Sequence, residues 1–491
     1  MAPLSHILNL SFKTGYIPTC MKTAVIKPIF KKGKPDEFTN YRPISLLSSF
    51  SKLLEKIAAN QMMKFLNKFK ILYEHQYGFR SGYNTTQPVI HFIDKISKAL
   101  NNPEENQVSL AIFIDLTKAF DTCDINILLH KLENYGFRGI SNIWFKNYLT
   151  GRYQYTSIRG VNSSLKEMSC GVPQGSILGP ILFILLINDL PNASKLFSIL
   201  YADDTTLIKS GSNISQLFEI ANIELNKLAD WFKANRLTLN TSKTKYILFR
   251  HKYLAVNFSK ITLKIENETI DRIGAGCQEE SFKFVGIHLD EFLSWEFHSR
   301  KIRAKISGAV YALSKLKSLL PKKIKYLIYN SLFRSHIEYC ISAWGKSKSS
   351  EIKRIITLQK RAVRYIDNAR YNSHTGPIFN KYRILRFNDL VDFNQDCLLY
   401  NNVNGRLPTS FRNMFEKLSN FERSLSFKSP ILKHFQLNHL STFSMISLWN
   451  KLPLELKRKK SLNIFKSEYS RLLFTNYNLP CNNPRCYTCK N

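Results

Sequence analysis

Short apolar runs in the first half of the chain predict buried strands. Three of them are rich in β-branched and aromatic residues and are too short for typical helices: residues 108–115 (VSLAIFID), 200–208 (LYADDTTLI) and 245–250 (KYILFR). Residues 260–270 (KITLKIENETI) mix apolar and polar positions around Glu266-Asn267, which predicts a hairpin that turns at this pair.

Other segments repeat apolar residues three and four positions apart, which is the spacing of one helix face. Residues 52–70 and 214–237 are the clearest cases, and Asn213 stands where a helix N-cap is expected. Residues 124–149 also favour helix, and from about residue 297 the pattern is helical and basic. Strands that alternate with helices, followed by a basic helical region, predict an α+β core with a helical appendage.

Three aspartates stand within or at the end of two of the predicted strands. Asp115 ends the first run, and the Asp203-Asp204 pair interrupts the second. Such a pair is most often only a hairpin turn. If the two strands are neighbours in one sheet, however, the three carboxylates converge, and their repulsion requires a compensating cation. Mg²⁺ prefers oxygen ligands, and two such ions about 3.5–4 Å apart support phosphoryl transfer, so the cluster suggests a nucleotidyl transferase.

The charge of the chain points to a polyanionic partner. The 491 residues include 71 Lys and Arg against 36 Asp and Glu, a net charge of +35, and more than half of this surplus lies in residues 291–480. Nucleic acid is the partner that such a surplus favours, and a basic protein without such a partner is the alternative. With 44% hydrophobic residues the chain can build sizeable cores in two or three structural units.

The nine cysteines indicate a reducing compartment rather than a disulfide framework. Four of them lie in apolar stretches and are expected to be buried: Cys123, Cys170, Cys340 and Cys397. The first fifteen residues lack the pattern of a signal peptide, and the most apolar run, residues 177–187, is too short to span a bilayer. We therefore expect an intracellular protein, nuclear or cytoplasmic, without membrane contact.

Seven ordered segments resemble the motifs of reverse transcriptases of non-LTR (LINE-like) retrotransposons, of the jockey and CR1 type. The three that resemble central palm motifs are AIFIDLTKAFDT (111–122), GVPQGSILGPILFILLINDL (171–190) and LYADDTTLI (200–208). The others resemble finger motifs, at 28–57 and 75–86 (HQYGFRSGYNTT), and later palm and primer-grip segments, at 237–249 and 282–295. The resemblance covers roughly residues 4–300 and is specific because the segments occur in the family's order.

The resemblance implies a catalytic centre that holds two divalent cations, Mg²⁺ or Mn²⁺. Asp115 and Asp203 would bind both ions, Asp204 would contribute mainly negative charge, and the backbone carbonyl of Leu116 would be a further ligand. Lys243, in NTSKTK, matches a lysine that is proposed to protonate the departing pyrophosphate; a solvated lysine at a strand edge is the alternative.

The same resemblance implies a set of nucleotide contacts. Phe120 matches a bulky residue that excludes the ribose 2′-hydroxyl and so selects deoxynucleotides. Arg80, in YGFRSG, matches a residue that grips the triphosphate. Gln174 and Gly175 match a loop that lies against the nascent base pair. Arg42 is a weaker candidate for template or triphosphate contact, and a plain surface arginine is its alternative.

The implied architecture is the right-hand polymerase fold, of class α+β, with fingers and an antiparallel palm sheet followed by a mostly helical, basic thumb and a C-terminal region. We expect N-terminally truncated fingers at 1–110, a palm with a primer-grip-like hairpin at 111–290, a thumb or connection at 291–370 and a C-terminal region at 371–491. Since Met1 already lies in the first finger segment, we expect the family's upstream endonuclease to be absent. A fragment of a mobile-element gene or a host-adopted protein would fit this expectation.

The tail places three soft ligands, Cys481, Cys486 and Cys489, within nine residues. Tetrahedral zinc requires four ligands, so His439 or a second chain would have to complete the site. A reduced tail without metal is the alternative.

The sequence therefore predicts an RNA-directed DNA polymerase that binds an RNA template and a DNA primer, adds deoxynucleoside triphosphates to the primer 3′-hydroxyl and releases pyrophosphate. The alternative from another class is a catalytically inactive RNA-binding remnant, or a host-adopted protein, that keeps the palm as a scaffold. An RNA-dependent RNA polymerase is a third possibility, and Phe120 argues against it. The oligomeric state does not follow from the sequence.

Overall fold

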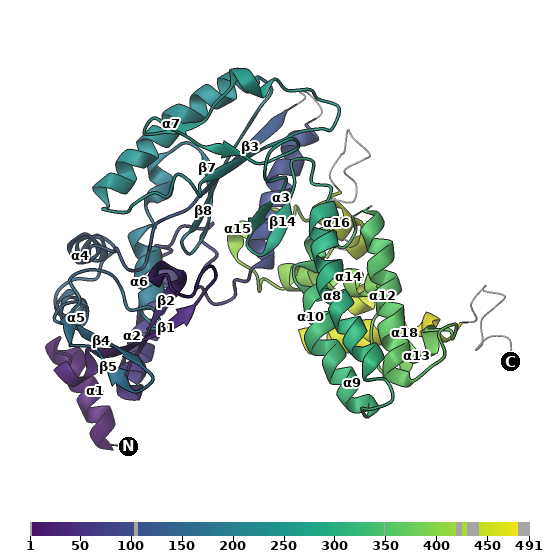
Figure 1. The fold of residues 1–491 in the computed structure, drawn as a ribbon, viewed down its shortest axis with the longest axis horizontal. Helices are drawn as coiled ribbons and strands as arrows, with labels where there is room; N and C mark the ends of the chain where they lie inside the picture. Colours follow the sequence, from purple (N-terminus) through teal and green to yellow (C-terminus); the bar gives the residue numbers. More distant parts are fainter. Residues whose placement is uncertain (1, 103–106, 348, 419–424, 430–440, 480–491) are drawn as a thin grey trace.

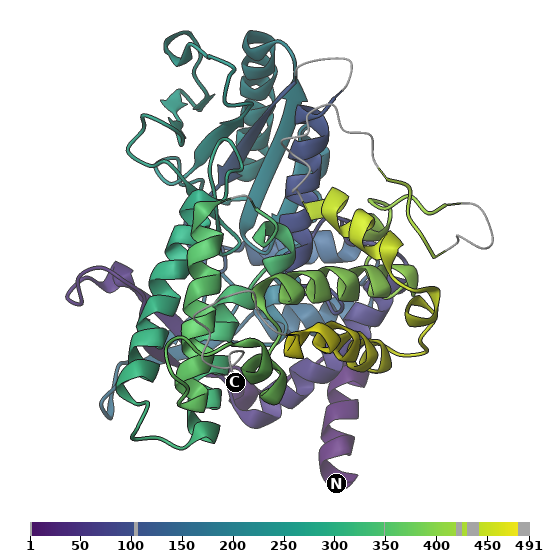
Figure 2. The same cartoon turned by 90° about the vertical axis from the view of Figure 1, so that its right-hand side faces the viewer.

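The computed structural model describes residues 2–102, 107–347, 349–418, 425–429 and 441–479. Figure 1 shows an arch in which a central sheet stands between an N-terminal lobe and a helical C-terminal lobe. In Figure 2 the long helices α8 (Glu296–Lys315) and α12 (Ser350–Asp367) of the C-terminal lobe run side by side. The sheet of the arch positions the carboxylates, and the two lobes flank it.

The central sheet has five strands in the order β12-β9-β3-β8-β7. Its bounds are β3 (Val108–Ile114), β7 (Phe197–Tyr201), β8 (Asp204–Gly211), β9 (Lys245–Phe249) and β12 (Asp271–Arg272). All neighbours are antiparallel except β12 and β9. The sheet therefore joins segments that lie more than 100 residues apart in the sequence.

Strand β3 lies in the middle of this sheet and is buried along its whole length. Ala111 and Phe113 face one hydrophobic core, which also contains helix α3 (Thr86–Leu100) and the helical lobe. Leu110 and Ile112 face a second core, which contains α6 (Gly179–Leu186) and α7 (Ile214–Ala234). Because both faces are covered, the strand is apolar at every position except Ser109, whose hydroxyl bonds to that of Ser210, and it does not alternate.

The N-terminal lobe contains a second sheet, in the order β2-β1-β4-β5, with β6 beside β4. The strands are β1 (Thr23–Phe30), β2 (Tyr41–Leu46), β4 (Tyr153–Ile158), β5 (Val161–Asn162) and β6 (Lys166–Glu167). The helices are α1 (Ala2–Thr14), α2 (Ser49–Lys68), α4 (Ile125–Asn134) and α5 (Ile140–Leu149). Parallel pairing of β1 with β4 ties residues before position 30 to residues after position 150.

The C-terminal lobe is helical. Besides α8 and α12 it contains α9 (Lys322–Ile328), a π-helical stretch (Tyr329–Arg334), α10 (Ser335–Glu338), α11 (Ile341–Trp344), α13 (Gly376–Lys381), α14 (Phe387–Val403), α15 (Thr409–Arg412), α16 (Ser441–Lys451), α17 (Leu454–Lys457) and α18 (Leu462–Phe474). One core runs from helix α3, which packs against the central sheet, through these helices up to Tyr477. The helices before and after residue 370 thus share one core, and the four-part division of the chain stays a prediction.

Small elements complete the fold. They are the hairpins β10 (Lys264–Ile265) with β11 (Glu268–Thr269) and β13 (Phe282–Phe284) with β14 (Ile287–Leu289), and the 3₁₀ helices Thr19–Met21, Phe38–Asn40, Leu190–Ala193, Phe258–Lys260 and Thr475–Asn478. The predicted turn at Glu266-Asn267 is confirmed, with φ of +50° and +71°, as a type I′ hairpin requires.

The strongly periodic segments fold as predicted. Helices α2 and α7 match the predictions for 52–70 and 214–237, and the Asn213 side chain accepts from the Gln216 N–H at 3.1 Å as an N-cap. The predicted helix at 124–149 is interrupted between α4 and α5, where Gly136 and Gly139 have positive φ. The α+β class and its antiparallel sheet are confirmed.

Three of the four cysteines that were expected to be buried are buried. Cys123, Cys340 and Cys397 are buried, but Cys170 is exposed, because it lies in a loop and its apolar neighbours in the sequence do not surround it. None of the helices in the described part of the chain has both the length and the hydropathy needed to span a bilayer. The apolar run at 177–187 instead forms the buried helix α6.

Candidate active site

The Asp203-Asp204 pair lies at a tight hairpin between β7 and β8. Tyr201 pairs with Asp204, so Ala202 and Asp203 form a two-residue loop. Ala202 has φ +57°, a left-handed conformation that residues other than glycine rarely adopt. Two-residue hairpins require positive φ within the loop because only then does the turn match the twist of the strands. The pair is thus both a turn and the carrier of the carboxylates.

Asp115 lies directly opposite this hairpin. Ile114 pairs with Thr205 in the antiparallel β3–β8 ladder, so the next position places Asp115 opposite Asp204. The two side chains share one face, because cross-strand partners in a ladder point to the same side of the sheet. The condition set by the sequence, that the two strands are neighbours in one sheet, is met: β3 and β8 pair at seven positions.

Backbone hydrogen bonds fix the chain on both sides of Asp115. Its N–H donates to Thr244 Oγ1 at 3.2 Å, and its carbonyl accepts from the Asn240 N–H at 2.9 Å. The Thr117 N–H donates to the Thr238 carbonyl at 2.9 Å, so Leu116 and Leu239 pair between this bond and the bond from Asn240 to Asp115. In that type of antiparallel pair the two residues turn their own N–H and C=O groups away from each other. The Leu116 carbonyl is therefore directed to the side of the sheet on which the carboxylate hairpin lies.

The neighbouring aspartates disfavour the charged form of each other's carboxyl groups. Burial by the surrounding protein and then the charges of Asp203 and Asp115 raise the pKa of Asp204 to about 6, although the side chain still reaches solvent. Burial also raises the pKa of Asp115; Lys243 opposes this shift and Asp203 adds to it. A cation at this edge of the sheet would relieve the repulsion.

Lys243 stands next to Asp115. Its Nζ lies 3.9 Å from Asp115 Oδ2, and its side chain is 66% exposed. A second source of positive charge is the loop after β1, since Lys31 and Lys32 also act on the Asp115 carboxylate. An exposed ion pair of this length contributes little to stability, so Lys243 is free to move toward a ligand.

The Gln174 loop is fixed by two neighbours, Asp121 and strand β2. Gln174 Nε2 donates to Asp121 Oδ1 at 2.7 Å, and the Gln174 carbonyl accepts from the Ser45 N–H of β2 at 2.7 Å. Gly175 has φ +109°, and a Cβ there would lie 2.8 Å from the Ser45 carbonyl oxygen. Only glycine fits such a position, so the loop packs on β2 with its backbone. A cavity of about 380 Å³ borders Asp121 and Gln174 at this point.

Phe120 packs beside the same loop. Its ring lies 4.6 Å from that of Phe183 and 6.3 Å, edge-on, from that of Phe79, and its carbonyl accepts from the Val172 N–H. The side chain is half-buried, so one part of the ring supports the core and another part remains accessible. This position is compatible with contact to a sugar ring.

Comparison with known families shows to which family the chain belongs. The sequence model of the family described as "Reverse transcriptase (RNA-dependent DNA polymerase)" matches residues 29–289, more than half of the chain. The chain belongs to the reverse transcriptase family.

The relatives of this reverse transcriptase chain come from mobile elements. It is 32% identical over 384 residues to the probable RNA-directed DNA polymerase from transposon BS of Drosophila melanogaster, covering 75% of this chain and 41% of the relative. It is 26% identical to the RNA-directed DNA polymerase from mobile element jockey of the same organism, covering 79% and 42%. The expected relationship to reverse transcriptases of LINE-like, jockey-type elements is confirmed. The chain spans about two fifths of the length of these curated relatives.

Among solved structures, apo telomerase from Candida tropicalis aligns with a TM-score of 0.44 and 13% identity, covering 80% of this chain and 66% of the other. Telomerase from Candida albicans in complex with a fragment of telomeric RNA aligns with the same TM-score and 12% identity, covering 78% and 70%. These scores are too low to define a shared fold by themselves.

The donor set of this reverse transcriptase chain suits a hard divalent cation. Carboxylates of Asp115, Asp203 and Asp204 and the Leu116 carbonyl supply oxygen ligands only, which Mg²⁺ and Mn²⁺ prefer. In the described residues, however, no three His, Cys, Asp or Glu side chains surround a common point closely enough to hold a metal. The aspartates therefore line one edge of the site, and rotamer changes with phosphate or water oxygens would have to complete a coordination shell.

Arg80 and Arg42, the two arginines predicted to contact the triphosphate or the template, differ in their exposure to solvent. The Arg80 guanidinium turns inward: Nη1 donates to the carbonyls of Tyr73 and Gln76, at 2.9 and 3.2 Å, and the group stacks on Tyr83 at 4.1 Å. Arg42 lies exposed on β2. In this arrangement Arg80 holds its own loop, and contact with a triphosphate would require the guanidinium to turn; its role stays a prediction.

Sequence reasoning missed a buried carboxylate behind the Gln174 loop. Glu55 of α2 is 1% exposed and accepts from the Ile177 N–H at 2.6 Å and from the Tyr148 hydroxyl at 2.8 Å. Burial raises the pKa of Glu55, while these two hydrogen bonds and the nearby Arg152 oppose the shift. A charged residue within the apolar face of the predicted helix was the signal that could have revealed it.

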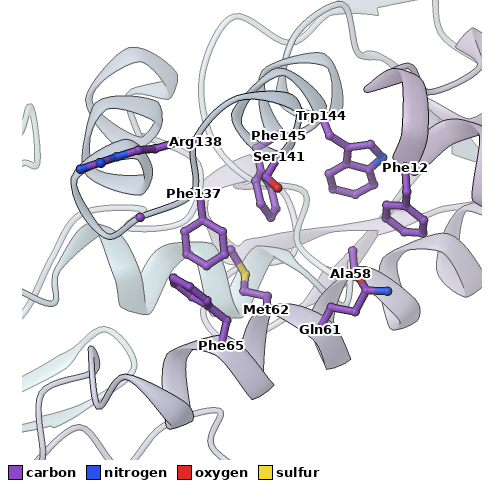
Figure 3. Close-up of a pocket in the computed structure, with 11 residues that line it drawn as sticks. Phe12, Ala58, Gln61, Met62, Phe65, Phe137, Arg138, Ser141, Trp144 and Phe145 are labelled. Atoms are coloured by element: carbon purple, nitrogen blue, oxygen red, sulfur yellow. The ribbon is translucent and has the colours of Figure 1, made fainter.

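Two other features lie outside this site. A pocket of about 340 Å³ opens between α1, α2 and α5, lined by aromatic side chains such as Phe12, Phe65, Phe137 and Trp144 and by the polar Gln61, Arg138 and Ser141 (Figure 3). The possible zinc ligands Cys481, Cys486 and Cys489, and His439, lie outside the described residues, so the zinc prediction is not tested.

Proposed function

We propose that this chain is an RNA-directed DNA polymerase of a non-LTR retrotransposon, which extends a DNA primer on an RNA template with deoxynucleoside triphosphates. Family membership supports this class of reaction. The observation that carries the proposal is the register of β3 and β8, which places Asp115 opposite Asp204 with Asp203 in the adjoining loop. The surplus of positive charge suits a nucleic-acid partner.

In this proposal Asp115, Asp203 and the Leu116 carbonyl hold two Mg²⁺ or Mn²⁺ ions, and Asp204 adds negative charge. The ions, when bound, lower the pKa of the primer 3′-hydroxyl and stabilise the charge on the phosphate oxygens. Lys243 is close enough to Asp115 to give a proton to the departing pyrophosphate.

The residues around the Gln174 loop orient the nucleotide in this proposal. Gln174 and Gly175 present a rigid backbone edge to the nascent base pair, because the loop is bound to β2 and to Asp121. Phe120 excludes a ribose 2′-hydroxyl, and Arg80 or Arg42 binds the triphosphate.

We further propose that residues 1–110 are fingers, 111–290 the palm, 291–370 a thumb or connection and 371–491 a C-terminal region. The basic helices of residues 297–370 would contact the template–primer backbone. Tyr329, Phe333 and Trp344 of these helices are fully buried, so such contacts fall to their exposed basic side chains and to Tyr311. An intracellular location follows from the proposed substrates.

Primer extension by the purified 491-residue chain tests the proposal. We expect incorporation of deoxynucleotides on an RNA template with Mg²⁺ or Mn²⁺, and loss of this activity in Asp203→Asn. Asp230→Asn, at an exposed position of α7, is the matched control and should behave as wild type. Absence of incorporation with both metals would leave the RNA-binding remnant, and a preference for ribonucleotides would indicate an RNA polymerase.

A further inference from the structure

A short segment of the N-terminal half runs along the edge of the catalytic hairpin. Residues 75–77 form a parallel bridge to β7: the Leu200 N–H donates to the His75 carbonyl at 3.0 Å, and the Tyr77 N–H donates to the Leu200 carbonyl at 2.8 Å. This segment lies in HQYGFR, for which the sequence suggested only Arg80 as a functional residue. It is bound to the strand that ends at the carboxylate turn.

The Gln76 side chain extends this contact to the turn itself. Gln76 is 1% exposed, and its Oε1 accepts from the Gly78 N–H at 2.8 Å and from the Ala202 N–H at 3.2 Å. Its Nε2 is buried and has no hydrogen-bond partner among the described residues. In a buried amide both the oxygen and the NH₂ group normally form hydrogen bonds. In Gln76 only the oxygen does so within the described part of the chain, and the contacts of the side chain to the turn are therefore made through this oxygen.

The Ala202 N–H needs a partner from outside the hairpin. In a two-residue loop the ladder bonds are made by the flanking Tyr201 and Asp204, and the first loop residue has no ladder partner. Ala202 is buried, so an unpaired N–H there would be costly. The Gln76 oxygen satisfies it and holds a residue whose φ is +57°.

Gly78 permits the close approach that this bond requires. A Cβ on Gly78 would lie 2.4 Å from the Ala202 nitrogen, a distance that real Cβ atoms do not show. The backbone at Gly78 therefore packs directly on the turn, and Gln76 and Gly78 enclose Ala202 from one side. Two independent features, a hydrogen bond and a steric fit, thus converge on the residue next to Asp203.

We propose that Gln76 is a positioning residue that fixes the Ala202-Asp203 loop and thereby holds the Asp203 carboxylate ready for divalent cations. Gln76 acts only through the backbone, since its amide bonds to the Ala202 N–H. This inference rests on the proposed function, because it takes Asp203 as a metal ligand.

Substitutions of similar volume test the inference without creating a cavity. Gln76→Met keeps the size of the side chain and removes the acceptor, whereas Gln76→Glu keeps the acceptor. Gln87→Met is the matched control: Gln87 is also fully buried in the same part of the chain, but it bonds to Asn84 and Gly82 instead of the turn. All three are made in the 491-residue chain.

Two readouts that do not depend on turnover decide the result. Hydrogen–deuterium exchange of residues 200–206 should become at least about 10-fold faster in Gln76→Met, because a buried N–H loses its acceptor. The Mn²⁺ concentration for half-saturation, followed by the EPR signal of free Mn²⁺, should rise about 5-fold or more. Gln76→Glu should restore the exchange protection, and Gln87→Met should change neither value in this segment.

Unchanged exchange at 200–206 and unchanged Mn²⁺ binding in a folded Gln76→Met overturn the inference, and so does an equal change in Gln87→Met. If Gln76→Met does not fold, failure of Gln76→Glu to protect residues 200–206 overturns it as well. Primer extension by wild type is a separate measurement, and its absence overturns the proposed polymerase function. Weaker Mn²⁺ binding and faster exchange in Gln76→Met would still support the positioning role.

Discussion

The two sides of the candidate active site are built in different ways. The carboxylates come from neighbouring strands of one sheet, and the register of β3, β7 and β8 alone places Asp115 next to the Asp203-Asp204 hairpin. The opposite side, the nucleotide side, carries the nucleotide contacts proposed for Phe120, Gln174 and Gly175. It is assembled from separate segments, which are bound to each other through Ser45, Asp121 and Glu55. The carboxylate side therefore depends on secondary structure, and the nucleotide side depends on single long-range contacts.

The largest effect is expected on the carboxylate side. Asp115→Asn or Asp203→Asn should reduce the rate of primer extension at least about 100-fold, since metal-based charge stabilisation contributes several kcal/mol to the transition state. Thermal stability should not fall, because each change removes one of several mutually repelling charges. A single-turnover assay together with a melting curve checks both statements. Activity of Asp203→Asn would contradict the assignment of Asp203 as a catalytic residue.

The next largest effect concerns the backbone of the nucleotide side. Gly175→Ala should destabilise the protein by about 2–4 kcal/mol, because the new Cβ meets the Ser45 carbonyl and φ is +109°. Gly160→Ala has a similar φ of +87° but open space around it, so it should cost only about 1–2 kcal/mol. Urea unfolding measures both, and equal losses would show that the loop does not pack tightly on β2.

A smaller effect is expected behind the same loop. Glu55→Gln leaves one carbonyl oxygen to serve both the Ile177 N–H and the Tyr148 hydroxyl, and should cost about 1–3 kcal/mol. The KM for deoxynucleotides should rise more than kcat falls, because the loop that carries Gln174 is displaced. Tyr148→Phe keeps the Ile177 bond and should leave this KM close to wild type. Equal KM values in both variants would contradict the prediction that Glu55 supports nucleotide binding.

The smallest effect is a pH dependence of stability. The pKa of Asp204 is raised to about 6, above the roughly 3.9 of an unfolded aspartate. The folded state then holds the proton more tightly, so stability falls as pH rises from about 4 to about 6 and stays lower above it. Asp204→Asn should abolish this decrease, with a gain below about 1 kcal/mol at pH 7 because solvent screens the exposed carboxylate. Melting curves of both proteins at pH 4 and pH 7 without metal measure the difference, and parallel curves would contradict it.

The sequence was sufficient wherever local pattern decides structure. The helices at 49–68 and 214–234, the Asn213 cap and the type I′ turn at Glu266-Asn267 follow from periodicity and turn chemistry within a few residues. The break between α4 and α5 and the exposure of Cys170 did not follow, because both depend on what packs around the segment. Family resemblance, rather than propensity, pointed to Phe120, Gln174 and Gly175.

The sequence by itself determined that Asp115 and the Asp203-Asp204 pair sit beside apolar strands, since the length and composition of an apolar run are properties of each segment. Only the tertiary structure decided that these strands are neighbours in register, that Gln76 binds the Ala202 N–H and that Glu55 holds the loop after Gln174. The physical reason is that each of these contacts joins residues more than 85 positions apart. Such pairs form because a buried N–H must find an acceptor, and the sequence does not state which distant acceptor the fold will bring to it.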